Sequence, residues 1–185
     1  MKLVRIFGPE SNPLEGLFAV SYQKGGQDCF RAFLDDCRDI ENVLNFLKKH
    51  LADLHKYFDY PIDPYEAVDQ IGEEIDELES LFLKSALDPK KWGNLQTVFK
   101  PLNNLIYKLD FLQESKAVSK RKHPMVRIYA IRISPLTYVI TGGAIKITDK
   151  MSERQHTIDQ LTNIRKVCAW LELEMVDADE IQRLL

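Results

Sequence analysis

Residues 125–148 read MVRIYAIRISPLTYVITGGAIKIT, and they carry the strongest strand signal of the chain. Its two halves, 125–133 and 137–148, are rich in β-branched and aromatic residues, which is typical of strands. The Ser-Pro-Leu sequence at 134–136 lies between them and favours a turn. The stretch therefore predicts a tight antiparallel hairpin.

Gly142 and Gly143 interrupt the second strand of this hairpin. Glycines inside a strand mark either a bulge that curls the sheet or a place where another group approaches the backbone closely. The sequence leaves both interpretations open: a bend around the last helix, and the floor of a groove for a substrate.

The first part of the chain predicts a second hairpin followed by helices. Residues 2–7 and 16–22 are short strand-like runs separated by Gly, Pro and Asn. Asp28 begins one helical pattern, and apolar residues at spacings of three and four continue from 40 to 58. Asp63, followed by Pro64 and Glu66, is typical of a helix start, and that helix is expected to reach about Leu87.

The rest of the chain flanks the central hairpin. We expect residues 97–113 to pass through a turn into a strand, and the basic stretch 115–124 to be a loop. A final helix begins at Asp149 or Ser152, because an apolar stripe follows to Leu171.

These elements predict an α+β fold, with a twisted antiparallel sheet and packed helices. The 185 residues divide into 1–89, a small hairpin plus an acidic helical region, and 90–185, a sheet with a terminal helix. Both parts fit within the size of one compact unit.

Composition and the N-terminus indicate a cytoplasmic protein with no membrane partner. No apolar run approaches the roughly 20 residues that span a bilayer. The opening MKLVRIFGPE reaches a charge, a Gly and a Pro before a signal-peptide core could form.

Neither a metal nor a cofactor is expected. Cys29, Cys37 and Cys168 lack the Cys-x-x-Cys spacing of a zinc site, and His123 and His156 have no second ligand at a suitable spacing. The phosphate-loop and dinucleotide-binding fingerprints are absent as well.

The charges divide between the two parts of the chain. From Asp35 to Leu81 there are 14 acidic residues against 4 basic, whereas from Lys90 to His156 there are 13 basic against 4 acidic. Such asymmetry indicates an anionic partner for the basic half, although the two halves could also neutralise each other.

Strand alternation groups the residues that carry the chemistry. Arg127 and Tyr129 share one face of their strand, and Arg132 lies on the other. Arginine and lysine stabilise phosphate charge, tyrosine stacks on bases or transfers protons, and a histidine at a helix N-terminus, such as His156, can act as a base. A solvated charged face is the alternative interpretation.

The segments VFKPLNNLIYKLDF and VRIYAIRISPLTYVITGGAIKITDKMSERQHTIDQLTNIRKVCAWL resemble the RelE/HigB-like toxins of bacterial toxin–antitoxin systems, especially the phage-derived HigB-type branch. The likeness covers about residues 95–173. ITGGAIK and RIYAIRI look like a narrower bacterial group that shares this core. The matching positions are Lys100 and Leu102, Arg127 with Tyr129 or Arg132, and Lys146 to Lys150.

The resemblance implies a toxin of a type II system, a metal-independent endoribonuclease that acts on ribosome-bound mRNA and is neutralised by an antitoxin protein. It implies that Arg127, Arg132 and Lys146 stabilise charge and that Tyr129 or His156 transfers protons. The basic residues expected to bind RNA are Lys100, Lys120, Arg121, Lys122, Lys150 and Arg154.

The N-terminal half has no counterpart in that family, and this suggests an alternative. Its acidic helices could cover the basic sheet face, which would make the chain a non-catalytic or autoinhibited interaction protein. Glu73 or Asp76 packed against Arg127, Tyr129 and Lys146 would indicate this arrangement.

Overall fold

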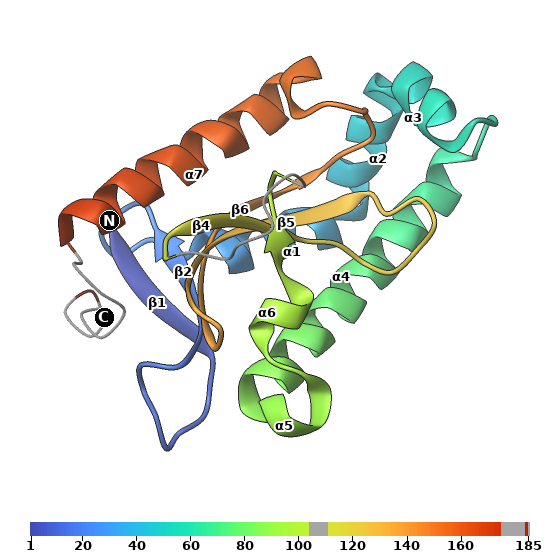
Figure 1. Cartoon of the computed structure of the whole chain (residues 1–185). Coiled ribbons are helices and arrows are strands. Elements are labelled where there is room, and N and C mark those ends of the chain that lie inside the picture. The colour runs from blue at the N-terminus through green and yellow to red at the C-terminus, as the bar shows by residue number, and fades with distance from the viewer. Residues whose placement is uncertain (104–110, 175–183, 185) are drawn as a thin grey trace.

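The hairpin predicted from residues 125–148 forms the centre of a six-stranded sheet in the computed structural model (Figure 1). The structure describes residues 1–103, 111–174 and 184. The strand order is β1-β2-β6-β5-β4-β3. The strands are β1 (Lys2–Phe7), β2 (Gly16–Ser21), β3 (Lys100–Pro101), β4 (Gln113–Ala117), β5 (Val126–Ser134) and β6 (Thr137–Ile145).

The N-terminal hairpin joins this sheet through one parallel pair. β2 runs parallel to β6 from Gly16 opposite Thr137 to Ala19 opposite Ile140, whereas the other neighbours are antiparallel. The antiparallel sheet expected from the second half is present in β3 to β6, and the parallel pair arises only where the N-terminal hairpin joins it. Helices connect β2 to the rest of the sheet, and a long crossover of this kind permits parallel pairing.

Helices cover both faces of the sheet (Figure 1). α7 (Gln155–Glu174) packs on one face through Ile164, Val167 and Leu171. The larger helical layer packs on the other face, so the mixed α+β class is confirmed. Its helices are α1 (Cys29–Arg38), α2 (Ile40–Lys49), α3 (Leu51–Phe58), α4 (Pro64–Leu87), α5 (Pro89–Trp92) and α6 (Leu95–Val98).

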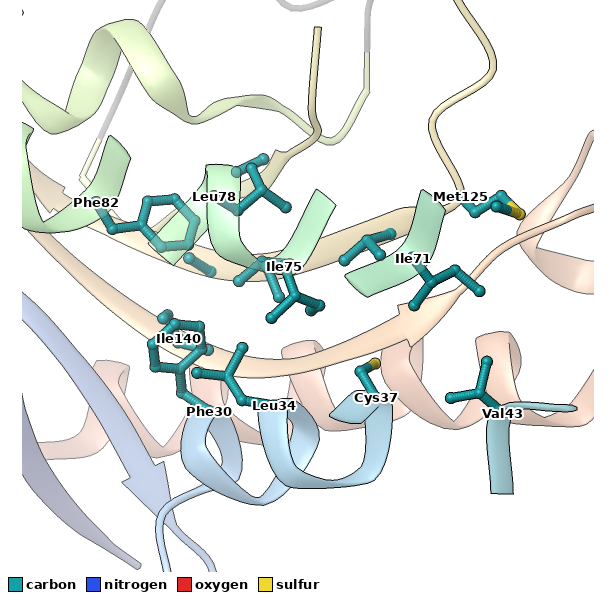
Figure 2. Close-up of a cluster of buried hydrophobic side chains, with 14 of the residues drawn as sticks. Phe30, Leu34, Cys37, Val43, Ile71, Ile75, Leu78, Phe82, Met125 and Ile140 are labelled. Carbon is teal, nitrogen blue, oxygen red and sulfur yellow. The ribbon is translucent and has the colours of Figure 1, made fainter. Parts of the chain in front are cut away.

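The larger core combines side chains from both parts of the chain. Figure 2 shows residues of α1 and α4 together with Met125 and Ile140 from the second half. Phe82 of α4 stacks on Phe99, whose ring centroid lies 4.8 Å from that of Tyr138 on β6. The described residues of 1–89 and of 90–185 thus share one sheet, and both ranges contribute to the larger core.

Local sequence signals place the helix starts as expected. The Asp28 carboxylate accepts hydrogen bonds from the backbone N–H groups of Phe30 and Arg31, and Asp63 accepts one from Tyr65 at 2.8 Å. The predicted pattern from 40 to 58 is instead two helices. His50 leaves helical geometry at φ −112° and ψ 31°, and α3 continues the apolar stripe from there.

The region before β5 differs from the expectation. The strand predicted within 97–113 falls largely on residues 104–110, outside the described residues. Residues 115–117, predicted as loop, belong to β4, where Lys116 pairs with Tyr129. Ser115 and Ala117 are buried, and these small residues let β4 pack against the core.

A bulge at Thr141 reverses the alternation along β6. The register shifts between Tyr129 and Ala130, so that Ile140 packs in the core beneath α1 while Ala144 packs with α7. A strict two-residue alternation would have put both side chains on the same face.

Gly142 and Gly143 let a helix approach each face of β6. A Cβ at Gly142, where φ is +151°, would lie 2.2 Å from Oε1 of Gln160 on α7. A Cβ at Gly143 would lie 2.3 Å from Cδ1 of Phe33 on α1. The pair therefore allows the bulge and the close packing of α1 and α7. Both glycines also line a cavity of about 320 Å³.

Alanine at Gly143 is expected to lower the free energy of unfolding by about 2 kcal/mol, because the added methyl group overlaps the Phe33 ring. Chemical denaturation of Gly143→Ala, Phe33→Ala and the double variant measures this. The double variant should be more stable than the sum of the single effects predicts. Gly72→Ala is the control, since nothing lies within 4 Å there, and should stabilise α4 by about 1 kcal/mol. Strictly additive effects would contradict the contact.

Candidate functional site

Three cationic side chains from neighbouring strands lie on the α7 side of the sheet. Lys116 on β4 is opposite Tyr129, which packs in the α7 core, and Arg127 on β5 is opposite Ala144, which packs there too. Lys146 follows two residues after Ala144 and so shares its face. We call Lys116, Arg127 and Lys146 the cation cluster.

The charges of the cation cluster act on one another. Burial, followed by the neighbouring Arg127 guanidinium, lowers the pKa of the Lys116 amino group. Burial and then Arg127 also lower the pKa of Lys146, with a smaller lowering from Lys116 and an opposing influence of Asp149 and Glu153. An amine with a lowered pKa exchanges protons closer to neutral pH than an ordinary lysine.

Backbone carbonyls hold all three members of the cluster. Lys116 Nζ donates to the carbonyl of Leu102 at 3.3 Å. Arg127 Nη1 donates to the carbonyls of Pro124 and Val126, the latter at 3.0 Å, and Nη2 lies 3.5 Å from the Tyr57 hydroxyl. Lys146 Nζ donates to the carbonyls of Thr148 and Asp149. Among the described residues, no carboxylate lies within 4.0 Å of the Arg127 guanidinium or of the Lys146 amine, so these two positive charges are held without an ion pair.

Tyr129 lies beneath the cluster with a buried hydroxyl. Its side chain is 1% exposed, and within the described part of the chain the hydroxyl has no hydrogen-bond partner. Burial raises the pKa of Tyr129 to about 12, against a smaller lowering by Arg127. Buried polar groups are normally hydrogen-bonded, so this hydroxyl is an unsatisfied polar group beneath the Arg127 guanidinium.

Tyr129 is expected to make stability fall at high pH. Because burial raises the pKa of Tyr129, the phenol loses its proton at a lower pH in the unfolded chain than in the folded chain. The protonated phenol therefore contributes to the stability of the folded state below pH 10, and this contribution is lost as the pH rises towards 12. Denaturation at pH 9 and pH 11 should show Tyr129→Phe losing about 1 kcal/mol less than the parent chain. The exposed Tyr65→Phe variant is the control and should lose as much as the parent. Equal losses in all three proteins would contradict the prediction.

Arg132 does not join the cation cluster. It lies on the opposite face of β5, as strand alternation predicts, beside Tyr138. Its Nη2 donates to Oε1 of Gln96 at 3.2 Å. Arg132 therefore connects α6 to the sheet on the side of the larger core.

His156 also lies apart from the cluster. Its Nε2 is 2.9 Å from the Ile145 carbonyl oxygen, and its ring packs edge-on against Phe46, with centroids 5.1 Å apart. Since the ring joins the start of α7 to α2, its surroundings fit a packing contact better than a proton-transfer group.

The residues expected to bind RNA fall into two groups. Both arginines are held by carboxylates: Arg154 donates twice to Asp53 at 2.7 Å, and Arg121 donates to Glu73 at 2.6 Å. The lysines Lys100, Lys120, Lys122 and Lys150 are exposed.

The acidic helix α4 lies on the other face of the sheet from the cation cluster. Glu73 binds Arg121, and Asp76 binds Arg38. The buried Glu74 carboxylate accepts hydrogen bonds from Met125 N at 3.0 Å and Val126 N at 2.9 Å. In the described residues, α4 therefore contacts the basic loop and the start of β5, and neither Glu73 nor Asp76 packs on the cluster.

Lys116 is the member of the cluster that sequence reasoning missed. The sequence predicts residues 115–124 as a loop, and only the register of β4 against β5 brings Lys116 beside Arg127. The small residues on either side of it, Ser115 and Ala117, are a weak local signal for a strand, and their burial is seen in the structure.

In the described part of the chain, no group of three or more His, Cys, Asp or Glu side chains gathers in a way that would hold a metal ion. None of the helices in that part of the chain combines the length and the apolar character needed to cross a bilayer.

Comparison of the chain with protein-family models, with curated proteins and with solved structures finds no match. Its function is therefore inferred from the cation cluster and from the sequence resemblance.

Proposed function

We propose that the chain is a RelE/HigB-like toxin of a type II toxin–antitoxin system, an endoribonuclease that cleaves ribosome-associated mRNA in the cytoplasm without a metal ion. The observation that carries this proposal is the cation cluster itself. Arg127 and Lys146 sit on one sheet face, held by carbonyls rather than carboxylates, above the unpartnered hydroxyl of Tyr129.

Such a site suits cleavage within the RNA backbone. The ribose 2′ oxygen attacks the adjacent phosphorus, its bond to phosphorus forms, and the bond from phosphorus to the 5′ oxygen breaks. The products are a 2′,3′-cyclic phosphate and a 5′-hydroxyl. In this scheme Arg127 stabilises the extra negative charge on the phosphate oxygens, as guanidinium groups do through paired hydrogen bonds.

The two lysines are the proton-transfer groups in this scheme. The lowered pKa of Lys146 makes its ammonium a better donor to the leaving 5′ oxygen than an ordinary lysine. The lowered pKa of Lys116 provides more of the neutral amine that accepts the 2′ proton. Tyr129, whose pKa is raised to about 12 and whose hydroxyl is buried, is not used as a proton-transfer group in this scheme.

The alternative is a non-catalytic interaction protein that keeps the same surface. One observation favours it: the carbonyls that hold Arg127 and Lys146 would have to share these groups with a phosphate. In either case the partner expected at the cluster is anionic, either RNA or an acidic segment of an antitoxin.

Growth arrest after induced expression tests the proposal. The intact chain should arrest growth, and Arg127→Ala combined with Lys146→Ala should not, at equal amounts of folded protein. Arg165→Ala with Lys166→Ala is the matched control, since both side chains are exposed on α7 and the charge change is the same. Arrest by the double cluster variant, or none by abundant intact protein, would contradict a nuclease that uses these residues.

A further inference from the structure

A second cationic surface surrounds Trp92, away from the cation cluster. The Trp92 side chain is 47% exposed, which is unusual for so large an apolar group. Two lysine amines lie over its ring, Lys84 Nζ at 5.0 Å and Lys91 Nζ at 5.1 Å from the centroid. The indole is thus presented to solvent between positive charges.

The end of α4 builds this arrangement. Asp88 follows the last residue of α4 and caps α5, where its carboxylate accepts a hydrogen bond from Lys91 N at 3.2 Å. Gly93, at φ +82°, ends α5. The four-residue helix therefore turns back beside α4, and this brings Trp92 to Lys84 (Figure 1).

The basic loop after β4 completes the surface. A cavity of about 330 Å³ is lined by Glu77, Ser80, Leu81, Lys84, Trp92 and Lys120. The Glu77 carboxylate accepts a hydrogen bond from Lys120 N at 3.4 Å, and this contact, with the Glu73–Arg121 pair, anchors the loop on α4. A lysine from the loop, one from α4 and an indole from α5 consequently border one hollow.

We propose that Trp92, Lys84, Lys91 and Lys120 form a docking surface for single-stranded RNA. One base stacks on the indole, and the lysine amines, which move aside on flexible stems, bind the flanking phosphates. Base stacking on an aromatic side chain is worth about 1–3 kcal/mol and tolerates any sequence. An acidic protein segment would use the lysines but not the indole face. The inference rests on the proposed function for the class of ligand, RNA, and on none of its chemical steps.

Tryptophan fluorescence tests this surface in the full chain. Trp170→Phe leaves Trp92 as the sole tryptophan, since the chain contains two. The probe is a single-stranded 2′-O-methyl RNA 12-mer, which lacks the nucleophile and so reports binding without cleavage. Binding should quench the Trp92 emission, and anisotropy of a labelled 12-mer should show about tenfold weaker binding to Trp92→Ala.

Two further variants separate stacking from charge. Trp92→Phe keeps an aromatic face and should bind more tightly than Trp92→Ala. Lys84→Gln with Lys91→Gln should reduce the slope of log Kd against log salt by about 1.4, the amount expected for two phosphate contacts to a single strand. Leu87→Ala, exposed near the end of α4, should bind as the parent does.

The outcomes distinguish this surface from the proposed active site. Arg127→Ala with Lys146→Ala should retain the Trp92 quenching while losing cleavage of ordinary RNA. Quenching by a parent chain that cleaves no RNA would keep the docking surface and overturn the nuclease. Binding without quenching, with Trp92→Ala unaffected, would overturn the docking surface, as would equal displacement of the 12-mer by a polyglutamate peptide of the same charge.

Discussion

Alanine at both Arg127 and Lys146 is expected to slow RNA cleavage by the purified chain by at least about 100-fold. Removing one group that stabilises transition-state charge typically costs about 10²–10³ in rate, and the double change removes two cations that lie on one face of the sheet. Single-turnover cleavage of a short labelled RNA measures the effect. Arg165→Ala with Lys166→Ala should cleave within about threefold of the parent rate.

The pH dependence of the same reaction tests the role of Lys146. Because burial and Arg127 lower the pKa of Lys146, the proton donor is lost at a lower pH than for a free lysine, and the rate should fall as the pH rises through that value. Lys146→Arg keeps the positive charge at all accessible pH values and should move the fall to higher pH. An unchanged profile would exclude Lys146 as the proton donor.

Glu74→Ala is expected to lower the free energy of unfolding by about 3 kcal/mol. The Glu74 side chain is fully buried, and its two oxygens accept the N–H groups of Met125 and Val126. Alanine leaves these two donors without an acceptor, and each buried unpaired group costs about 1–3 kcal/mol. Urea denaturation followed by circular dichroism measures the change.

Two matched variants show whether the loss comes from these hydrogen bonds. Glu74→Gln retains one acceptor oxygen and should cost less than alanine. Glu79→Ala removes a carboxylate of the same helix that pairs with Arg38 at the surface, and should cost less than about 1 kcal/mol. A loss at Glu74→Ala no larger than at Glu79→Ala would contradict the account of how α4 anchors the start of β5.

This anchor connects the N-terminal half to the cation cluster. Val126 accepts the hydrogen bond from Arg127, and its own N–H donates to Glu74 on the other side of the sheet. α4 therefore helps to position Arg127 from the opposite face of the sheet, through the Val126 backbone.

The sequence predicts those parts of the fold that depend on local chemistry. The β5–β6 hairpin follows from its strand-forming residues and turn, and the start of α4 follows from the Asp63 cap and Pro64. The parallel pairing of β2 with β6 could not be predicted, because no local pattern specifies which strand edges meet across a helical crossover. The bulge at Thr141 was suggested by the glycines, but its effect on the face of Ile140 required the register.

The candidate site shows the same division. Arg127 and Tyr129 were grouped by alternation along one strand, and the structure places Lys146 on the same side. Lys116 could not be assigned to the cluster from the sequence, because its place beside Arg127 depends on how β4 pairs with β5. The engagement of Arg154 by Asp53, 101 residues away, depends on where the first turn of α3 lies relative to α7, so a sequence pattern cannot reveal that this guanidinium is already paired.

The chemistry of the RNA ends shows whether the cation cluster cleaves RNA through the 2′ oxygen. Purified intact chain is incubated with a defined mRNA, free and on translating ribosomes, and the new ends are identified. Attack by the 2′ oxygen predicts 2′,3′-cyclic phosphate and 5′-hydroxyl ends from the parent chain and none from Arg127→Ala with Lys146→Ala. No cleavage of either substrate by the folded parent chain, or the same ends at the same rate from the double variant, would contradict the claim that the cation cluster is a ribonuclease site.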